Sequence, residues 1–121
     1  AATNHPELLD EISAVTTTTV CEFDNGSFHT YTLDPTAYGF ALCDKAELVG
    51  GTPEENAQIT KDILSGKITD GKRTAVILNA GAALHITNQI SLEDGFALAA
   101  DILNNGSGLK KLDDFIAATN A

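Results

Sequence analysis

The dipeptide Gly50-Gly51 divides the chain into two parts of different character. Before it, β-branched and aromatic residues form short runs separated by turn residues, which is typical of strands. After it, apolar residues recur at helical spacing almost to the end of the chain. With 121 residues, the chain can build one hydrophobic core. We therefore expect a single α+β unit in which a β-hairpin is followed by about four helices.

Asn25-Gly26 predicts the turn of the hairpin, because this dipeptide tolerates the positive φ angles of a tight turn. The strands are expected at residues 16–23 and 27–33, which are rich in Thr, Val and aromatic residues. Asp34-Pro35 ends the second strand, since proline cannot donate a hydrogen bond to a sheet. Residues 38–49 have no clean period, so we interpret them as a connecting segment with room for one short helix.

Capping residues delimit the predicted helices. The first begins after Thr52, with Pro53 in its first turn and Glu55 closing a capping box, and it stops near Gly66. The second spans residues 72–87. The third opens at Ser91 and ends at Asn104-Asn105-Gly106, and the fourth is capped by Ser107 and carries Leu109, Leu112, Phe115 and Ile116.

The second helix is apolar on nearly every side, which predicts burial on all sides. We expect it to be the most buried element, with Val76, Leu78 and Leu84 inside the protein.

The charge and cysteine content exclude several classes of function. Lys and Arg number 7 and Asp and Glu 17, giving a formal net charge of −10, so neither nucleic acid nor an anionic membrane is an expected partner. Cys21 and Cys43 are too few for a disulfide framework and lack zinc-ligand spacing. We interpret them as free thiols of a cytoplasmic protein. Residues 1–10 lack a signal-peptide pattern, and no apolar run approaches the roughly 20 residues of a membrane span.

The histidines and the arginine of the chain do not form a pattern that indicates a catalytic or phosphate-binding site. His5, His29 and His85 are scattered along the chain, so we assign them structural or surface roles. Arg73 is the only arginine, whereas a site that binds several phosphates would normally use more.

Asp10-Glu11 is the most informative polar pair. Adjacent carboxylates at a loop entrance can bind Mg²⁺ directly or through its waters, and such an ion often bridges to substrate phosphates. In a chain this acidic, a solvated acidic dipeptide is the commoner origin of such a pair. The residues alone therefore predict a soluble α+β domain and name no reaction.

The succession of motifs resembles a known family. The motifs, in chain order, are Leu9-Asp10-Glu11-Ile12-Ser13, Thr19-Val20-Cys21-Glu22, Tyr31-Thr32-Leu33-Asp34-Pro35, Tyr38-Gly39-Phe40, Gly50-Gly51-Thr52-Pro53-Glu54-Glu55-Asn56-Ala57, Ala75-Val76-Ile77-Leu78-Asn79-Ala80 and Ser91-Leu92-Glu93-Asp94-Gly95. In this order and at this spacing they resemble the C-terminal part of anthranilate phosphoribosyltransferase, a transferase of tryptophan and hence amino-acid biosynthesis. The resemblance covers nearly the whole chain from Leu9 onward.

The resemblance implies that residues 1–121 are the C-terminal portion of the large α/β domain of a phosphoribosyltransferase, one kind of glycosyltransferase. Such an enzyme transfers phosphoribosyl from phosphoribosyl pyrophosphate (PRPP) to anthranilate with the help of Mg²⁺. The Asp-Glu of the first motif resembles the family's magnesium-binding pair, so Asp10 and Glu11 are the implied metal ligands. No catalytic residue is carried over. Asn56 and Asn79 also match the motifs of the family, and we interpret both as residues that form hydrogen bonds within helices and loops.

The resemblance also implies what lies outside this chain. The glycine-rich pyrophosphate loop, the anthranilate pocket and the small helical domain belong to the rest of the family's length, and the complete enzyme is expected to be a homodimer. We therefore expect this chain alone to transfer no phosphoribosyl group, to expose an apolar patch, and to self-associate or bind the missing N-terminal portion. Residues 1–7 do not resemble the strand expected before the first motif.

Two alternatives stay open. One is a non-catalytic stand-alone module that retains the fold. The other is a nucleoside phosphorylase, which shares the architecture but should not show the Leu-Asp-Glu-Ile-Ser succession.

Overall fold

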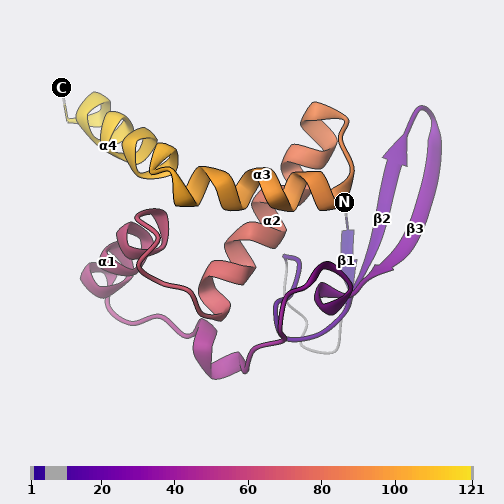
Figure 1. Cartoon of the computed structure of the whole chain (residues 1–121), viewed down its shortest axis with the longest axis horizontal. Coiled ribbons are helices and arrows are strands. Elements are labelled where there is room, and N and C mark those ends of the chain that lie inside the picture. The colour runs from indigo at the N-terminus through magenta and orange to yellow at the C-terminus, as the bar shows by residue number, and fades with distance from the viewer. Residues whose placement is uncertain (1, 5–10, 121) are drawn as a thin grey trace.

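The computed structural model describes residues 2–4 and 11–120, which form a three-stranded antiparallel sheet followed by four α-helices (Figure 1). The sheet has the order β1 (Ala2–Asn4), β2 (Thr18–Asp24), β3 (Ser27–Leu33). The helices are α1 (Pro53–Leu64), α2 (Gly71–Asn88), α3 (Leu92–Asn104) and α4 (Ser107–Thr119). Two short 3₁₀ helices, η1 (Pro35–Tyr38) and η2 (Lys45–Leu48), lie between β3 and α1, and η2 is the short helix expected within residues 38–49. The predicted order of a hairpin and then four helices is confirmed.

The hairpin is anchored at its base and open at its tip. Asn25 and Gly26 adopt positive φ angles of 50° and 82°, as the tight turn requires. Val20 and Leu33 are buried where the hairpin meets the helices, whereas Phe28 near the turn is 75% exposed. In Figure 1 the hairpin accordingly stands out at the end of the molecule away from α4.

Strand β1 corrects the expectation for the first residues. Residues 2–4 pair antiparallel with β2, with Thr3 opposite Val20. Three residues are too few to show an alternating pattern, so the strand was not visible in the sequence. It forms because the outer edge of β2 offers unpaired backbone groups to a neighbouring chain segment.

The helix boundaries follow the predicted caps with one exception. Thr52 and Glu55 form the capping box of α1, and Ser91 caps α3. The fourth helix is capped by Gly106, whose φ is 79°, rather than by Ser107. The Asn105 side chain accepts the Ser107 N–H instead, so Ser107 already lies inside the helix.

Helices α2 and α3 make the most extensive helix contact in the described chain and cross in Figure 1. Two glycines allow their backbones to approach. A Cβ atom on Gly95 would lie 2.3 Å from the Gly81 carbonyl oxygen, and one on Gly81 would lie 2.5 Å from a Phe96 ring carbon. Phe96 is buried at this crossing and makes edge-to-face contacts with Tyr38 and Phe40, with ring centroids 5.0 and 5.8 Å away.

The expectation that α2 is buried on every side is wrong. Leu78 is fully buried, and Val76 and Leu84 are half-buried against the core, but Ile86 is 53% exposed. The core is shared with α3, which contributes Phe96, Ala99 and Leu103. An apolar sequence shows that a helix tolerates burial, whereas the number of elements that cover it decides how much is buried.

Large apolar side chains are exposed on several elements: Phe23, Phe28, Leu42, Val49, Ile86, Phe115 and Ile116. Within the described residues, no helix combines the length and apolar character needed to cross a membrane.

We predict that Gly95→Ala destabilises the chain by about 1 to 3 kcal/mol, the usual cost of overpacking a tight contact. The reason is the overlap of the added methyl group with the Gly81 carbonyl oxygen. Alanine has the higher helix propensity, so without this overlap the substitution would be stabilising. Denaturant unfolding measures the change.

Gly108→Ala in α4 is the matched control, because its Cβ would meet only the side chains of Leu64 and Ile102. A Gly95→Ala chain as stable as the Gly108→Ala chain would contradict the close helix crossing.

Candidate functional site

The candidate site is the loop of residues 11–16, which leads into β2 and begins at the predicted metal pair. Asp10 lies outside the described residues. Glu11 is described, and its side chain is exposed to solvent, whereas Ile12, Ser13 and Ala14 directly after it are buried. The loop therefore presents one carboxylate outward from a main chain that is held inside the protein.

Asn79 of α2 holds the loop at Ile12. The Ile12 N–H donates to Asn79 Oδ1 at 2.9 Å, and Asn79 Nδ2 donates to the Ile12 carbonyl oxygen at 2.9 Å. A third hydrogen bond, from Nδ2 to the Ala75 carbonyl oxygen one turn earlier, fixes the Asn79 side chain on its own helix. The interpretation of Asn79 as a hydrogen bonder is thus confirmed, and its partner is the loop of the predicted metal pair.

The loop is also tied to the base of the hairpin. The Ser13 N–H donates to Thr18 Oγ1 at 3.1 Å, and Ser13 Oγ accepts the N–H groups of Val15 and Thr16. Ser13 and Thr18 are both buried, so these hydrogen bonds satisfy polar groups that water does not reach.

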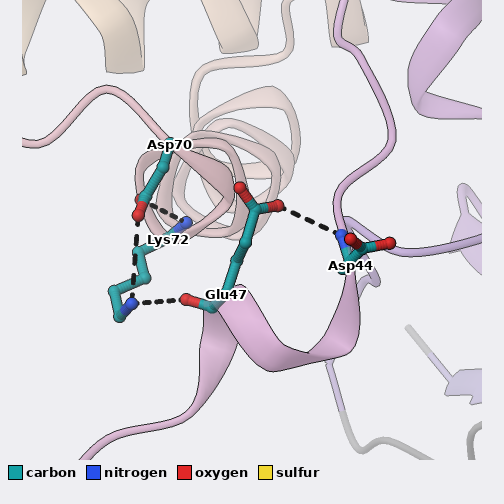
Figure 2. Close-up of polar contacts among 4 residues, drawn as sticks. All are labelled: Asp44, Glu47, Asp70 and Lys72. Carbon is teal, nitrogen blue, oxygen red and sulfur yellow. Dashed lines mark hydrogen bonds and ion pairs between the residues drawn. The ribbon is translucent and has the colours of Figure 1, made fainter.

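A third anchor comes from the connecting segment. The Cys43 N–H donates to the carbonyl oxygen of Ala14 at 3.0 Å. Figure 2 shows how the following residues are held to α2: Lys72 Nζ donates to the Glu47 carbonyl oxygen and lies 3.9 Å from the Asp70 carboxylate. The Glu47 carboxylate in turn accepts the Asp44 N–H at 3.1 Å, which closes the turn of η2.

Cys43 is packed tightly against the start of α2, since a Cβ on Gly71 would lie 2.4 Å from its sulfur atom. Burial raises the pKa of the Cys43 thiol above its usual value, and the negative charge of Glu47 and a hydrogen bond to that side chain raise it further. The thiol therefore stays protonated at neutral pH and is a packing group here rather than a nucleophile.

The donor atoms of the loop suit Mg²⁺. Carboxylate oxygens are the ligands this ion prefers, and an exposed position leaves room for the waters it retains. Among residues 2–4 and 11–120, no group of three or more His, Cys, Asp or Glu side chains could hold a metal ion. A magnesium site at Glu11 would thus need Asp10 and further oxygen atoms from water or a ligand.

Of the remaining candidates, His85 and Arg73 make contacts that join different elements. His85 Nε2 lies 2.7 Å from Glu22 Oε1, and its Nδ1 contacts the Ile90 carbonyl oxygen, so the ring ties α2 to β2. His29 is exposed on β3, and His5 lies outside the described residues. Arg73 donates to Asn104 Oδ1 at 3.2 Å and links α2 to the end of α3.

Tyr31 is a second group whose titration the fold changes. Burial, and to a lesser degree the Glu22 charge, raises its pKa to about 12. The phenol thus stays neutral beside the contact between Glu22 and His85.

Sequence reasoning proposed the metal pair at the start of this loop but did not identify the residues that hold the loop in place. Asn79 was visible as one amide inside the apolar run Ala75-Val76-Ile77-Leu78-Asn79-Ala80, and a polar side chain in such a run signals a buried hydrogen bond. Nothing in the pattern pointed to Ile12, which is 67 residues away along the chain.

Comparison with known proteins shows the family to which the chain belongs. Residues 3–109 match the sequence model described as "Glycosyl transferase family, a/b domain". The chain belongs to this family. Among its relatives are the anthranilate phosphoribosyltransferase of Methanobrevibacter smithii, 45% identical over 93% of this chain and 34% of the relative, and that of Acetivibrio thermocellus, 42% identical over 93% of this chain and 33% of the relative.

Solved structures of the same enzyme share the fold. The Thermus thermophilus enzyme superimposes with a TM-score of 0.86 at 32% identity, over 97% of this chain and 35% of that chain. The Saccharomyces cerevisiae enzyme in complex with PRPP and Mg superimposes with a TM-score of 0.85 at 25% identity, over 98% of this chain and 34% of that chain. This glycosyl transferase family chain thus spans about a third of the length of the curated relatives it matches.

We predict that Glu47→Gln, made in a Cys21→Ala background, increases the rate at which iodoacetamide alkylates Cys43 at pH 8. The Glu47 charge helps to raise the thiol pKa, and glutamine keeps the hydrogen-bond acceptor but not this charge, so more thiolate is present at a given pH. The midpoint of the rate against pH should move to lower pH.

Burial, the largest cause, remains, so the midpoint should stay above the usual value of 9.0. Glu54→Gln removes the same charge from an exposed position in the first turn of α1 and should leave the rate unchanged. Equal rates in the Glu47→Gln and Glu54→Gln chains would contradict the contact between Glu47 and the thiol.

Proposed function

We propose that this chain supplies the magnesium-binding loop of an anthranilate phosphoribosyltransferase and forms the C-terminal portion of its large α/β domain. The observation that carries the proposal is the agreement in fold, over 98% of this chain, with the Saccharomyces cerevisiae enzyme in complex with PRPP and Mg. The 45% identity with the Methanobrevibacter smithii enzyme supports the same assignment. The same identity favours the transfer of phosphoribosyl to anthranilate over the reaction of a nucleoside phosphorylase.

In the proposed reaction, the amino group of anthranilate displaces pyrophosphate from the anomeric carbon of PRPP. Asp10 and Glu11 would hold Mg²⁺, which when bound neutralises charge on the departing pyrophosphate. Two carboxylates cannot fill an octahedral shell, so these residues would bind the ion weakly by themselves and more tightly together with pyrophosphate oxygens.

The hydrogen bonds around residues 12–14 would restrict the orientation of the Glu11 carboxylate. Ile12 is held by α2, Ser13 by Thr18 and Ala14 by the Cys43 N–H. Positioning of this kind lowers the barrier because it need not be created during the reaction. This chain would therefore contribute a well-positioned metal-binding loop, while the residues that bind PRPP and anthranilate would come from the rest of a longer protein.

The test uses a chimera in which this chain replaces the corresponding third of the Methanobrevibacter smithii enzyme. We predict that Asp10→Ala with Glu11→Ala lowers turnover at limiting Mg²⁺ more than about tenfold, since even the loss of outer-shell partners typically costs about 10- to 100-fold in metal affinity. Excess Mg²⁺ should recover part of the loss. The measurement is the rate of phosphoribosyl anthranilate formation as a function of Mg²⁺ concentration.

Asp113→Ala with Asp114→Ala is the matched control, because it removes two adjacent carboxylates from the exposed face of α4. It should leave the magnesium dependence unchanged. An unaltered magnesium dependence in the Asp10/Glu11 variant would overturn the metal role. Turnover by the 121-residue chain alone would overturn the division of labour between this chain and the rest of the protein.

A further inference from the structure

We infer that Asn79 is a positioning residue for the proposed metal site: its side-chain amide, presented by α2, fixes the main chain at Ile12, which directly follows Glu11. The inference rests on the proposed function, because it assumes that the Asp10 and Glu11 carboxylates bind Mg²⁺. It goes beyond that function by naming the element that restricts the main chain beside Glu11.

The first step is the completeness of the contact. Asn79 Oδ1 accepts from the Ile12 N–H, and the two hydrogens of Nδ2 are directed to the carbonyl oxygens of Ile12 and Ala75, each at 2.9 Å. Both main-chain groups of Ile12 are thus bound by one side chain. Because that side chain is also bonded to its own helix, it cannot rotate without losing hydrogen bonds.

The second step is that Ile12 directly follows Glu11 in the chain. The Ile12 N–H belongs to the peptide that joins it to Glu11, so fixing this N–H fixes the plane of that peptide. The Ile12 side chain is only 6% exposed and cannot swing outward without leaving the core. Glu11 is thereby held with its side chain in solvent, which is where an ion and its phosphate ligand would meet it.

The third step is the chemistry of the amide. Only an amide side chain offers an acceptor to an N–H and donors to two carbonyl oxygens from one end. Alanine removes all three hydrogen bonds, and aspartate would place an oxygen opposite the carbonyls of Ile12 and Ala75. A geometry-demanding ion such as Mg²⁺ should respond strongly to the freedom gained by its ligands.

The chain contains a matched control for this role. Asn56 in the first turns of α1 makes the same kind of double contact with another residue. Its Oδ1 accepts the Gly51 N–H at 2.8 Å, and its Nδ2 donates to the Gly51 carbonyl oxygen at 3.2 Å. Asn56→Ala removes an equivalent pair of hydrogen bonds on a different helix. It therefore shows what the loss of such a pair does when the pair is not the one between Asn79 and Ile12.

The experiment follows Mn²⁺, a paramagnetic substitute for Mg²⁺, on the ¹⁵N-labelled 121-residue chain in the presence of inorganic pyrophosphate. In the unmodified chain, the amide resonances of Glu11 and Ile12 should broaden first as Mn²⁺ is added. In Asn79→Ala the apparent Mn²⁺ affinity should fall by about 10- to 100-fold, the usual effect of losing an outer-shell partner. Asn56→Ala should bind Mn²⁺ as the unmodified chain does. Unchanged resonances of α3 in each variant show that the fold is intact.

Two outcomes would overturn the inference in distinguishable ways. Equal Mn²⁺ affinity in Asn79→Ala and the unmodified chain would remove the positioning role and leave the metal role standing. No broadening at Glu11 in the unmodified chain would remove the metal role, and with it this inference. If Asn79→Ala does not fold, Asn79→Asp is compared with Asn56→Asp, which adds the same charge, and the same two results decide.

Discussion

The pairing of Asn79 with Ile12 is the interaction on which the candidate site depends. It joins residues that are 67 positions apart, and it satisfies both main-chain groups of a residue whose side chain is in the core. Leaving such groups without partners would cost about 1 to 3 kcal/mol each. The main chain at Ile12 can therefore lie inside the protein because α2 supplies these hydrogen bonds.

The position of α2 is set by its contact with α3. Gly81 and Gly95 allow the two backbones to touch, and Phe96 at the same crossing packs against Tyr38 and Phe40. The chain that follows these two aromatic residues reaches Cys43, whose N–H holds Ala14. The helix crossing thus supports the loop twice, once through Asn79 and once through the connecting segment. Lys72 strengthens the second route, because it binds the Glu47 carbonyl oxygen beside the start of α2 (Figure 2).

Local signals predicted much of this fold. The Asn25-Gly26 turn and the Thr52 and Ser91 caps depend on residues within a few positions of one another, so the sequence displays them directly. Strand β1 and the exposed side of α2 were missed because both depend on which elements lie alongside. The candidate site divides in the same way. The adjacent carboxylates could be proposed as metal ligands from the sequence, whereas the partner of Asn79 follows only from the packing of α2 against the loop.

The central claim is that α2 holds the main chain of the candidate metal loop, and hydrogen exchange of the Ile12 amide tests it most directly. The amide should exchange slowly, at a rate comparable to that of the buried Leu78 amide within α2. In Asn79→Ala its protection should be lost while that of Leu78 remains. An Ile12 amide that exchanges as fast as an unstructured peptide in the unmodified chain would contradict the claim.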